Sequence, residues 1–344
     1  MEAFNTSLII VLLIVALFDF TNGFHDAADM VATAIASRSI KPGIAIAIVS
    51  SATFIAPLTI GLAVADTVGT FIDISGASAL SGTSIIIGAL LSAISYNLVT
   101  WFLGYPSSSS NSLAGGLVGA GLYGVGSEQI HWGYEALLDG RLEGLMKVVM
   151  GLFASPLLGF IIGFLTMKGF FVVFSRLTVK ASRFFIVSQY FSIAWLGASH
   201  GANDAQKGMA IIGMMLLATG QTAQFTVPDW AVIWCASAIT LGTLFGGWRI
   251  IQTLGFGLFR VKPIHSVANQ MGSALVNSIA TAIGAPTSTS QVVTATLLGN
   301  GAAEKPGHVK WHTAAGIISG WWLNLPISFF LGWFYCFILT NIRA

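Results

Sequence analysis

The stretch Asp19–Arg38 reads D-F-T-N-G-F-H-D-A-A-D-M-V-A-T-A-I-A-S-R, and it follows the apolar run Leu8–Phe18, which is typical of a membrane helix. Three carboxylates, Asp19, Asp26 and Asp29, therefore fall where contacts with hydrocarbon should continue. One carboxylate at the centre of a bilayer costs about 2.5–3.5 kcal/mol on insertion scales. The stretch is either a polar loop between two spans or an interrupted helix whose freed carbonyl groups line a polar cavity. Its Gly and Asn favour the interrupted helix.

The same pattern returns 178 residues later in the chain. Residues 200–207, H-G-A-N-D-A-Q-K, align with residues 22–29, N-G-F-H-D-A-A-D, and they also follow an apolar run, Phe184–Leu196. A second pair is offset by 180: residues 97–111 read N-L-V-T-W-F-L-G-Y-P-S-S-S-S-N, and residues 277–291 read N-S-I-A-T-A-I-G-A-P-T-S-T-S-Q. Two motif pairs in one order indicate a duplicated half. Interrupted apolar segments at matching places in two halves point to a transporter's binding site.

The composition is that of a membrane protein. Of the 344 residues, 55% are hydrophobic and only 8% are charged, whereas about 25% is usual in soluble proteins. The apolar segments are long, which favours helices over the alternating strands of a barrel. We therefore expect an all-α polytopic membrane protein made of two inverted repeats, with broken helices, re-entrant helical hairpins and roughly ten to twelve crossings.

A basic segment separates the two halves. It carries Lys168, Arg176, Lys180 and Arg183 without any acidic residue, so the positive-inside rule puts it in the cytoplasm. The predicted organisation is a first transmembrane repeat at residues 1–167, a basic cytoplasmic linker at 168–183, and a second transmembrane repeat at 184–344.

Hydroxyl side chains follow Pro106 and Pro286, one proline in each half. Proline suits the first turn of a helix, and the unpaired N–H groups and dipole of a helix N-terminus favour an anion. Ser and Thr also cap helices in ordinary structural roles, but the duplication favours an anion site shared by both turns. The predicted anion ligands are Ser107, Ser108, Ser109, Ser110, Thr287, Ser288, Thr289 and Ser290.

The carboxylates near these turns require positive charge if an anion binds. No Arg lies in the four motifs and Lys207 is the one nearby base, so co-bound hard cations or protons must compensate. Na⁺ and Mg²⁺ prefer carboxylate, amide and backbone oxygens. His25 and His200 either relay protons or only bond to the cavity wall. The candidate cation ligands are Asp26, Asp29, Asp204, Asn22, Asn97 and Asn277.

These motifs together resemble the inorganic phosphate transporter (PiT) family. The resemblance rests on D-F-T-N-G-F-H-D-A-A-D-M-V-A-T from Asp19, on G-A-N-D-A-Q-K-G-M from Gly201, and on the two Pro-Ser/Thr turns, and it extends over essentially the whole chain. It implies inverted repeats, a phosphate site between them, symport with Na⁺ or H⁺ or as a metal–phosphate complex, and a homodimer. By position, Asp26, Asn203 and Asp204 match the family's ion and phosphate residues, as do the two hydroxyl turns.

Three positions depart from the family's pattern. Asp29 stands where the family commonly has Asn, which adds a carboxylate that alters cation choice or adds a proton site. Asn111 and Gln291 stand where His often follows the hydroxyl turns. These departures leave the identity of the coupling ion open.

The expected function is phosphate import by cation-coupled symport in the inner (plasma) membrane. The alternative is a sulfate or other oxyanion permease of the same fold, and an anion channel is a more distant one. Monohydrogen phosphate can donate a hydrogen bond to the acidic acceptors and sulfate cannot, which favours phosphate. The sequence carries no G-x-S-x-G elbow, P-loop or dinucleotide fingerprint, so we expect neither an enzyme nor a cofactor, and no nucleic-acid partner.

Overall fold

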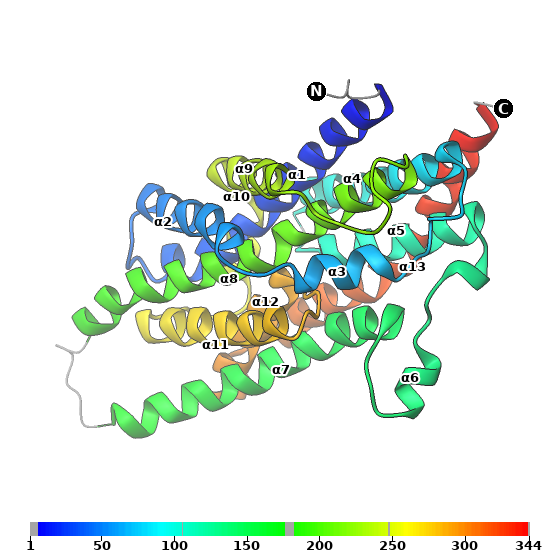
Figure 1. The fold of residues 1–344 in the computed structure, drawn as a ribbon. Coiled ribbons are helices and arrows are strands. Elements are labelled where there is room, and N and C mark those ends of the chain that lie inside the picture. Colours follow the sequence, from blue (N-terminus) through cyan, green and yellow to red (C-terminus); the bar gives the residue numbers. More distant parts are fainter. Residues whose placement is uncertain (1–5, 105, 176–181, 247, 343–344) are drawn as a thin grey trace.

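The computed structural model describes residues 6–104, 106–175, 182–246 and 248–342, which form a bundle of α-helices (Figure 1). An all-helical fold is therefore confirmed. The helices, in chain order, are α1 Thr6–Ala36, α2 Pro42–Ile55, α3 Ala63–Thr70, α4 Ala79–Leu103, α5 Ser109–Gly124, α6 Tyr134–Leu138, α7 Gly144–Val173, α8 Ser182–Ala218, α9 Asp229–Phe245, α10 Trp248–Gly257, α11 Pro263–Ala282, α12 Thr289–Glu304 and α13 Trp311–Ile342.

The helices α1 and α8 run without a break through the two carboxylate motifs, so the predicted interruption is wrong. The motif glycines serve close packing instead. A Cβ atom on Gly23 would lie 2.0 Å from the carbonyl oxygen of Ile239 in α9, and one on Gly201 would lie 2.3 Å from that of Thr53 in α2. Small residues allow membrane helices to approach this closely. Each motif helix is thereby fixed against a helix of the other half.

The chain does break at the two proline turns, as the sequence predicts. The helix α4 ends at Leu103 and α5 begins at Ser109, while α11 ends at Ala282 and α12 begins at Thr289. The second helix of each pair has 16 residues. At 1.5 Å per residue it is about 24 Å long, shorter than the hydrocarbon core of about 30 Å. A long helix, a turn and a short helix thus recur in both halves.

The helix order of the first half repeats in the second half. Figure 1 shows α1 and α8 crossing the molecule in opposite directions, and α7 and α13 doing the same. The last helix of each half packs against the other half: α7 lies along α11 and α12, and α13 lies along α4 and α5. The two halves are therefore interlocked rather than merely adjacent.

Four described helices, α1, α4, α7 and α13, are long and apolar enough to cross a membrane. The pair Pro42–Leu58 and Ala63–Thr70 would make a fifth span, and it bends by 74° at its break. The ten to twelve crossings expected from the sequence exceed this number, because many shorter or more polar segments were counted. The helix α13 is one continuous element with Pro326 inside it.

Both ends of the predicted basic segment, residues 168–183, lie in helices. Helix α7 continues to Val173 and α8 begins at Ser182. Arg176 and Lys180 lie outside the described residues.

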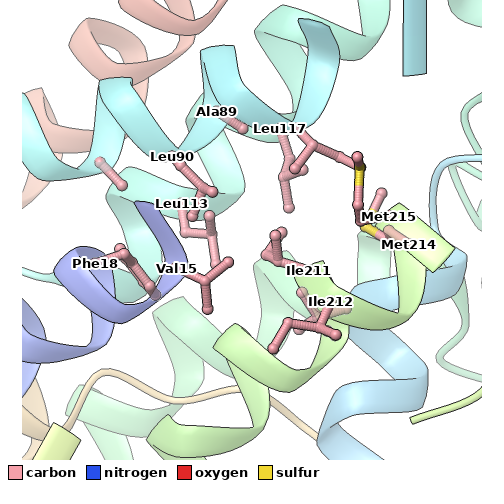
Figure 2. Packing of buried hydrophobic residues seen from close by; sticks show 14 of the residues in the cluster. Val15, Phe18, Ala89, Leu90, Leu113, Leu117, Ile211, Ile212, Met214 and Met215 are labelled. Carbon is pink, nitrogen blue, oxygen red and sulfur yellow. The ribbon is translucent and has the colours of Figure 1, made fainter. Parts of the chain in front are cut away.

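The largest apolar core forms where α1, α4, α5 and α8 meet (Figure 2). Val15 and Phe18 of α1 belong to one cluster with Leu90, Leu113 and Ile211. Along α1 this core precedes the carboxylate motif. The polar site therefore has an extensive apolar packing layer on that side.

Candidate functional site

Four segments meet in the interior: the middle of α1, the middle of α8, and the turns that begin α5 and α12. Each side chain selected from the sequence as an anion or cation ligand has at most 4% of its surface exposed. Away from water, polar groups must bond to one another or to a ligand. The hydrogen bonds between the four segments therefore define what the site can hold.

On the α1 side, two carboxylates contact the turn of the other half. The hydroxyl of Ser290 donates to Asp26 Oδ1 at 2.5 Å and also contacts Asp29 Oδ2. One turn earlier, the hydroxyl of Ser109 donates to Asn22 Oδ1 at 2.6 Å. Helix α1 thus bonds to both turns, which begin α5 and α12.

On the α8 side, the ammonium of Lys207 is buried, with 1% of the residue exposed. It donates to Asp204 Oδ1, to the hydroxyl of Ser110 and, at 2.9 Å, to the carbonyl of Thr287. The other oxygen of Asp204 accepts from the hydroxyl of Thr289 at 2.6 Å. Lys207 therefore links both turns to the second carboxylate motif through hydrogen bonds.

Amide side chains hold the second turn in place. The N–H of Thr287 donates to Asn203 Oδ1 at 3.0 Å, and Asn203 Nδ2 donates to Thr281 Oγ1 at 2.9 Å. The hydroxyl of Thr287 donates to Asn277 Oδ1 at 3.2 Å, and Asn277 Nδ2 lies 3.3 Å from Thr289 Oγ1. The structure thus brings Asn203 and Asn277 directly into the site.

Asn97 occupies a different environment from its repeat partner. Its Oδ1 faces the hydroxyl of Ser112 at 3.4 Å, and that hydroxyl also lies 2.8 Å from Asn324 Oδ1. Asn324 Nδ2 donates to the carbonyl of Ser108 at 2.7 Å. Asn97 therefore contacts the first turn of α5 and not the carboxylates.

Ser108 and Ser288 are the N-caps of α5 and α12. The hydroxyl of Ser108 accepts from the N–H of Asn111 at 3.0 Å, and that of Ser288 accepts from the N–H of Gln291 at 3.4 Å. The structural role left open by the sequence is therefore present at these two positions. In the first turn, Ser107 also lies against the ring of His25, its hydroxyl 3.3 Å from Nε2.

Among the residues that the structure describes, two groups of side chains have ligand atoms that all lie within 4.8 Å of one another: His25, Asp26 and Asp29, and Asp26, His200 and Asp204. Asp26 is common to both, with Nδ1 of His25 at 3.5 Å and Nδ1 of His200 at 3.8 Å. Asp26, Asp29 and Asp204 are thus buried together, and of these three only Asp204 forms an ion pair with the buried ammonium of Lys207. Such a cluster attracts further positive charge, and its carboxylate oxygens suit a hard cation.

The site is closed in this conformation. A cavity of only about 10 Å³ lies beside Ser110, Lys207 and Pro286, bounded on another side by Val68 and Phe71. One water molecule needs about 10–15 Å³, so a tetrahedral oxyanion does not fit. Binding therefore requires the two turns to move apart.

Two residues of this site, Lys207 and Asn324, were not among the ligands predicted from the sequence. Lys207 was noted only as a nearby base, although it contacts three site groups. Asn324 lies within the last apolar run of the sequence and was not among the predicted ligands. A polar side chain inside an apolar span was the available signal, since such residues face the interior of the bundle.

Comparison with known proteins agrees with this arrangement. The chain matches the model of the Phosphate transporter family over residues 22–332. A probable low-affinity inorganic phosphate transporter of Rhizobium meliloti (strain 1021) is 39% identical over 328 residues, which cover 93% of both chains. A protein of the same description from Bacillus subtilis (strain 168) is 35% identical over 339 residues, covering 97% of this chain and 98% of the relative.

A solved structure described as the sodium-dependent phosphate transporter has the same fold. It superposes with a TM-score of 0.85 at 20% identity and covers 98% of this chain and 100% of that chain. The resemblance to the inorganic phosphate transporter family is confirmed by the family match, which also makes this all-helical, multi-pass membrane protein a transporter and not an enzyme. The chain belongs to the phosphate transporter family.

Proposed function

We propose that this chain imports inorganic phosphate by symport with a cation, with alternating access to the buried site between its halves. Family membership supports the substrate. The observation that carries the coupling is the excess of buried carboxylates beside two helix N-termini suited to an anion. An anion enters such surroundings only together with compensating positive charge, and each ligand then strengthens the binding of the other.

Phosphate is bound by the hydroxyl turns Ser107–Ser110 and Thr287–Ser290 together with Asn203. In the closed conformation, Lys207 bonds to one group in each turn. When the turns separate, this ammonium and the N–H groups that begin α5 and α12 become available to the anion. Charge-assisted hydrogen bonds of this kind are about twice as strong as neutral ones.

The coupling cation is bound on the α1 side, where Asp26 and Asp29 lie without an ammonium of their own. Asp204 also contributes to this cation site, because its ligand atom lies within 4.8 Å of those of Asp26 and His200. The sodium dependence named for the solved relative supports Na⁺, while H⁺ and a metal–phosphate complex are other outcomes of the test below. The amide oxygens that complete the proposed set are those of Asn22 and Asn277. Asn97, predicted from the sequence as a further cation ligand, lies against the first turn of α5 instead and is left out of the set.

The proposed architecture is a pair of inverted repeats, residues 1–167 and 184–344, joined by the basic segment 168–183. The opposite directions of α1 and α8 and of α7 and α13 support it. Ten to twelve crossings follow if the short and bent helices are counted with the long ones. We further propose a homodimer in the inner (plasma) membrane, as the family resemblance implies.

The distribution of charge supports one orientation. Basic residues gather at the end of the bundle where α1 ends and α11 begins, namely Arg38, Lys41, Arg260 and Lys262. The connection at residues 126–143, at the opposite end, is acidic. By the positive-inside rule, the basic end faces the cytoplasm.

Uptake of radiolabelled phosphate into proteoliposomes tests the proposal. We expect an inward Na⁺ gradient to accelerate uptake and an excess of sulfate to leave it unchanged. A pH gradient that drives uptake without Na⁺ would identify H⁺ as the coupling ion, and a requirement for divalent metal would identify metal–phosphate. Phosphate uptake that depends on no cation would overturn the proposal. Competition by sulfate as strong as that by unlabelled phosphate would also overturn it.

A further inference from the structure

A second group of buried polar side chains lies between α1, α8 and α11, away from the carboxylates. The hydroxyl oxygen of Ser266 lies 3.0 Å from both Thr33 Oγ1 and Gln189 Oε1. Gln270 Nε2 donates to Ser266 at 3.3 Å, and the hydroxyl of Ser192 donates to Gln270 Oε1 at 2.6 Å. These five residues, which we name the polar seam, are each at most 4% exposed.

Several polar atoms next to the seam have no hydrogen-bond partner among the described residues. They are Nε2 of Gln189, both amide atoms of Asn269 and the hydroxyl of Ser273. Asn269 and Ser273 follow Ser266 at helical spacing on α11 and are fully buried, so they continue the same face. An unsatisfied buried polar group costs about 1–3 kcal/mol. Packing alone therefore gives no reason to retain them.

The polar seam begins at the phosphate site. On α11, the buried polar face runs from Ser266 through Ser273 to Asn277, whose amide bonds to Thr287 in the second turn. On α1, Thr33 follows Asp29 by one helical turn. Two helices thus extend polar surface from the site towards the basic end of the bundle.

The seam ends at a basic cavity of about 1080 Å³. The N–H of Ser37 bonds to the carbonyl of Thr33, and the N–H of Ser266 bonds to the carbonyl of Lys262, and both Ser37 and Lys262 line this cavity. Its other cationic lining residues include Arg38 and Arg260. The polar seam therefore lies one helical turn from this cavity on both α1 and α11, and we name the cavity the basic mouth.

The basic mouth retains unneutralised positive charge. Its acidic residue, Glu304, has Oε2 at 3.0 Å from Nε2 of His265 and accepts from Lys262 at 2.5 Å, and these two neighbours lower the pKa of Glu304 to about 2. In the described part of the chain, no carboxylate lies within ion-pair distance of Arg38 or Arg260. A pocket lined by one sign of charge concentrates the oppositely charged ligand.

The other half provides an internal comparison. Because α1 matches α8 at an offset of 178 and α4 matches α11 at 180, each seam position has a counterpart beyond the opposite side of the site. The counterparts of the seam residues Thr33, Gln189, Ser192, Ser266 and Gln270 are all apolar: Ile211, Val11, Ile14, Ile86 and Leu90. The counterpart of the neighbouring Ser273 is Ala93. Figure 2 shows Leu90 and Ile211 within the apolar core. The two halves therefore match in helix order, but the residues at these matched positions are polar on one side of the site and apolar on the other.

We propose that the polar seam is the route by which phosphate leaves towards the basic mouth, with Asn269, Gln270 and Ser273 forming a transient oxyanion subsite. The inference rests on the proposed function and adds to it the path by which phosphate is released. Neutral amide and hydroxyl donors suit this step, because conduction requires binding weak enough to let the ion go. The apolar residues at the matched positions exclude water from the opposite side of the site while water enters the seam.

Cysteine accessibility tests the route without measuring transport. Ser273→Cys is compared with Ala93→Cys, its matched position, in a background with Cys235 and Cys336 replaced by Ala. A charged thiol reagent applied from the cytoplasmic side should modify Ser273→Cys, and phosphate should slow the modification. The same reagent should leave Ala93→Cys unmodified.

Exchange kinetics provide the second readout. Gln270→Leu should slow phosphate exchange across proteoliposomes about tenfold, a barrier increase of about 1.4 kcal/mol, with unchanged equilibrium affinity for phosphate. Leu90→Met is the matched control and should exchange at the wild-type rate. Ser266→Ala is the second seam variant if Gln270→Leu does not fold.

Failure of this inference is distinguishable from failure of the proposed function. Wild-type exchange in the folded seam variants, or no labelling of Ser273→Cys from the cytoplasmic side, would overturn the release path even if cation-coupled uptake stands. An equal loss of affinity and of exchange rate would instead make the seam a support of the main site. Cation-independent uptake in the wild-type protein would reject the proposed function itself.

Discussion

The helices α1 and α8 carry opposite charges at one matched position, Asp29 in the first half and Lys207 in the second. Each side chain reaches the turn of the other half: Asp29 contacts the hydroxyl of Ser290, and Lys207 contacts that of Ser110. These two serines are themselves matched at the offset of 180. The two contacts between a motif helix and the opposite turn therefore match, but the charged side chain is a carboxylate in one and an ammonium in the other.

The difference shows how a duplicated fold acquires two unlike sites. Around Lys207 lie a carboxylate, a hydroxyl and a carbonyl oxygen, from Asp204, Ser110 and Thr287. These are the ligand types that an alkali cation uses, so the ammonium acts as a cation fixed to the chain. The α1 side offers oxygen ligands without a fixed cation. Under the proposed function, the α1 side therefore binds the transported cation.

Neutralising Lys207 should have the largest effect. Lys207→Gln removes a charged donor near the anion and leaves Asp204 buried without its partner. We expect phosphate binding to weaken about 100-fold, the equivalent of about 3 kcal/mol for a charged hydrogen bond. Isothermal titration with phosphate at fixed Na⁺ measures this change.

The matched control for this variant is Lys168→Gln, which removes an exposed ammonium. It should bind phosphate like the wild type. If Lys207→Gln remains folded and binds phosphate with wild-type affinity, the ammonium only neutralises Asp204. Partial rescue of Lys207→Gln by raised Na⁺ would strengthen the comparison, since a free cation would then replace the fixed one.

The carboxylates at the matched positions Asp26 and Asp204 should give unequal effects. Asp26→Asn should raise the Na⁺ concentration needed for half-maximal phosphate binding about 30-fold, or about 2 kcal/mol. Asp204→Asn should weaken cation dependence and transport together but raise that concentration less, because Lys207 already neutralises this carboxylate. The measurement is phosphate binding as a function of Na⁺ and of pH. Wild-type cation dependence in both folded variants would reject the cation site.

Asp29→Asn should have a smaller effect than Asp26→Asn. Asp26 belongs to both carboxylate groups, whereas Asp29 belongs to one. We expect the required Na⁺ concentration to rise about tenfold, or about 1.4 kcal/mol, with phosphate still bound at saturating Na⁺. The exposed carboxylate Asp139 supplies the control variant Asp139→Asn. An unchanged Na⁺ requirement would remove Asp29 from the cation site.

The two helix caps should give the smallest and most equal effects. Ser108→Ala and Ser288→Ala each remove a cap from a helix that carries proposed phosphate ligands, at a cost of about 1 kcal/mol. We expect both to weaken phosphate binding by about the same factor, a few-fold. Thermal unfolding in detergent, measured with and without phosphate, separates stability from binding. Unequal losses would show that the halves differ even at their matched turns.

Much of the site follows from sequence because its residues sit in duplicated motifs. The proline turns at Pro106 and Pro286 and the burial of the carboxylates were predicted correctly. Prolines disrupt helices locally, and carboxylates in apolar surroundings must lie inside the bundle. Both features depend on short stretches of chain, which a sequence displays directly.

Features that depend on tertiary packing were predicted less well. Gly23 was interpreted as a helix break, but its role depends on the approach of Ile239, more than two hundred residues away. The direction of Lys207 depends on how α8 lies against α5 and α12. The bend after Leu58 differs from these two features, because Pro57 and Gly61 flank it and both residue types interrupt helices. Helix packing over long sequence separations decides the roles of Gly23 and Lys207.

The interlocked last helices also constrain how the protein is made. The faces of α4 and α5 that contact α13 are synthesised roughly 190 residues before that helix appears. At typical synthesis rates of about 5–20 residues per second, this interval is about 10–40 s. During that time lipid, a chaperone or the insertion machinery must cover those faces. The first half therefore completes its packing only after the chain's final helix enters the membrane, and truncation within α13 leaves both halves unfinished.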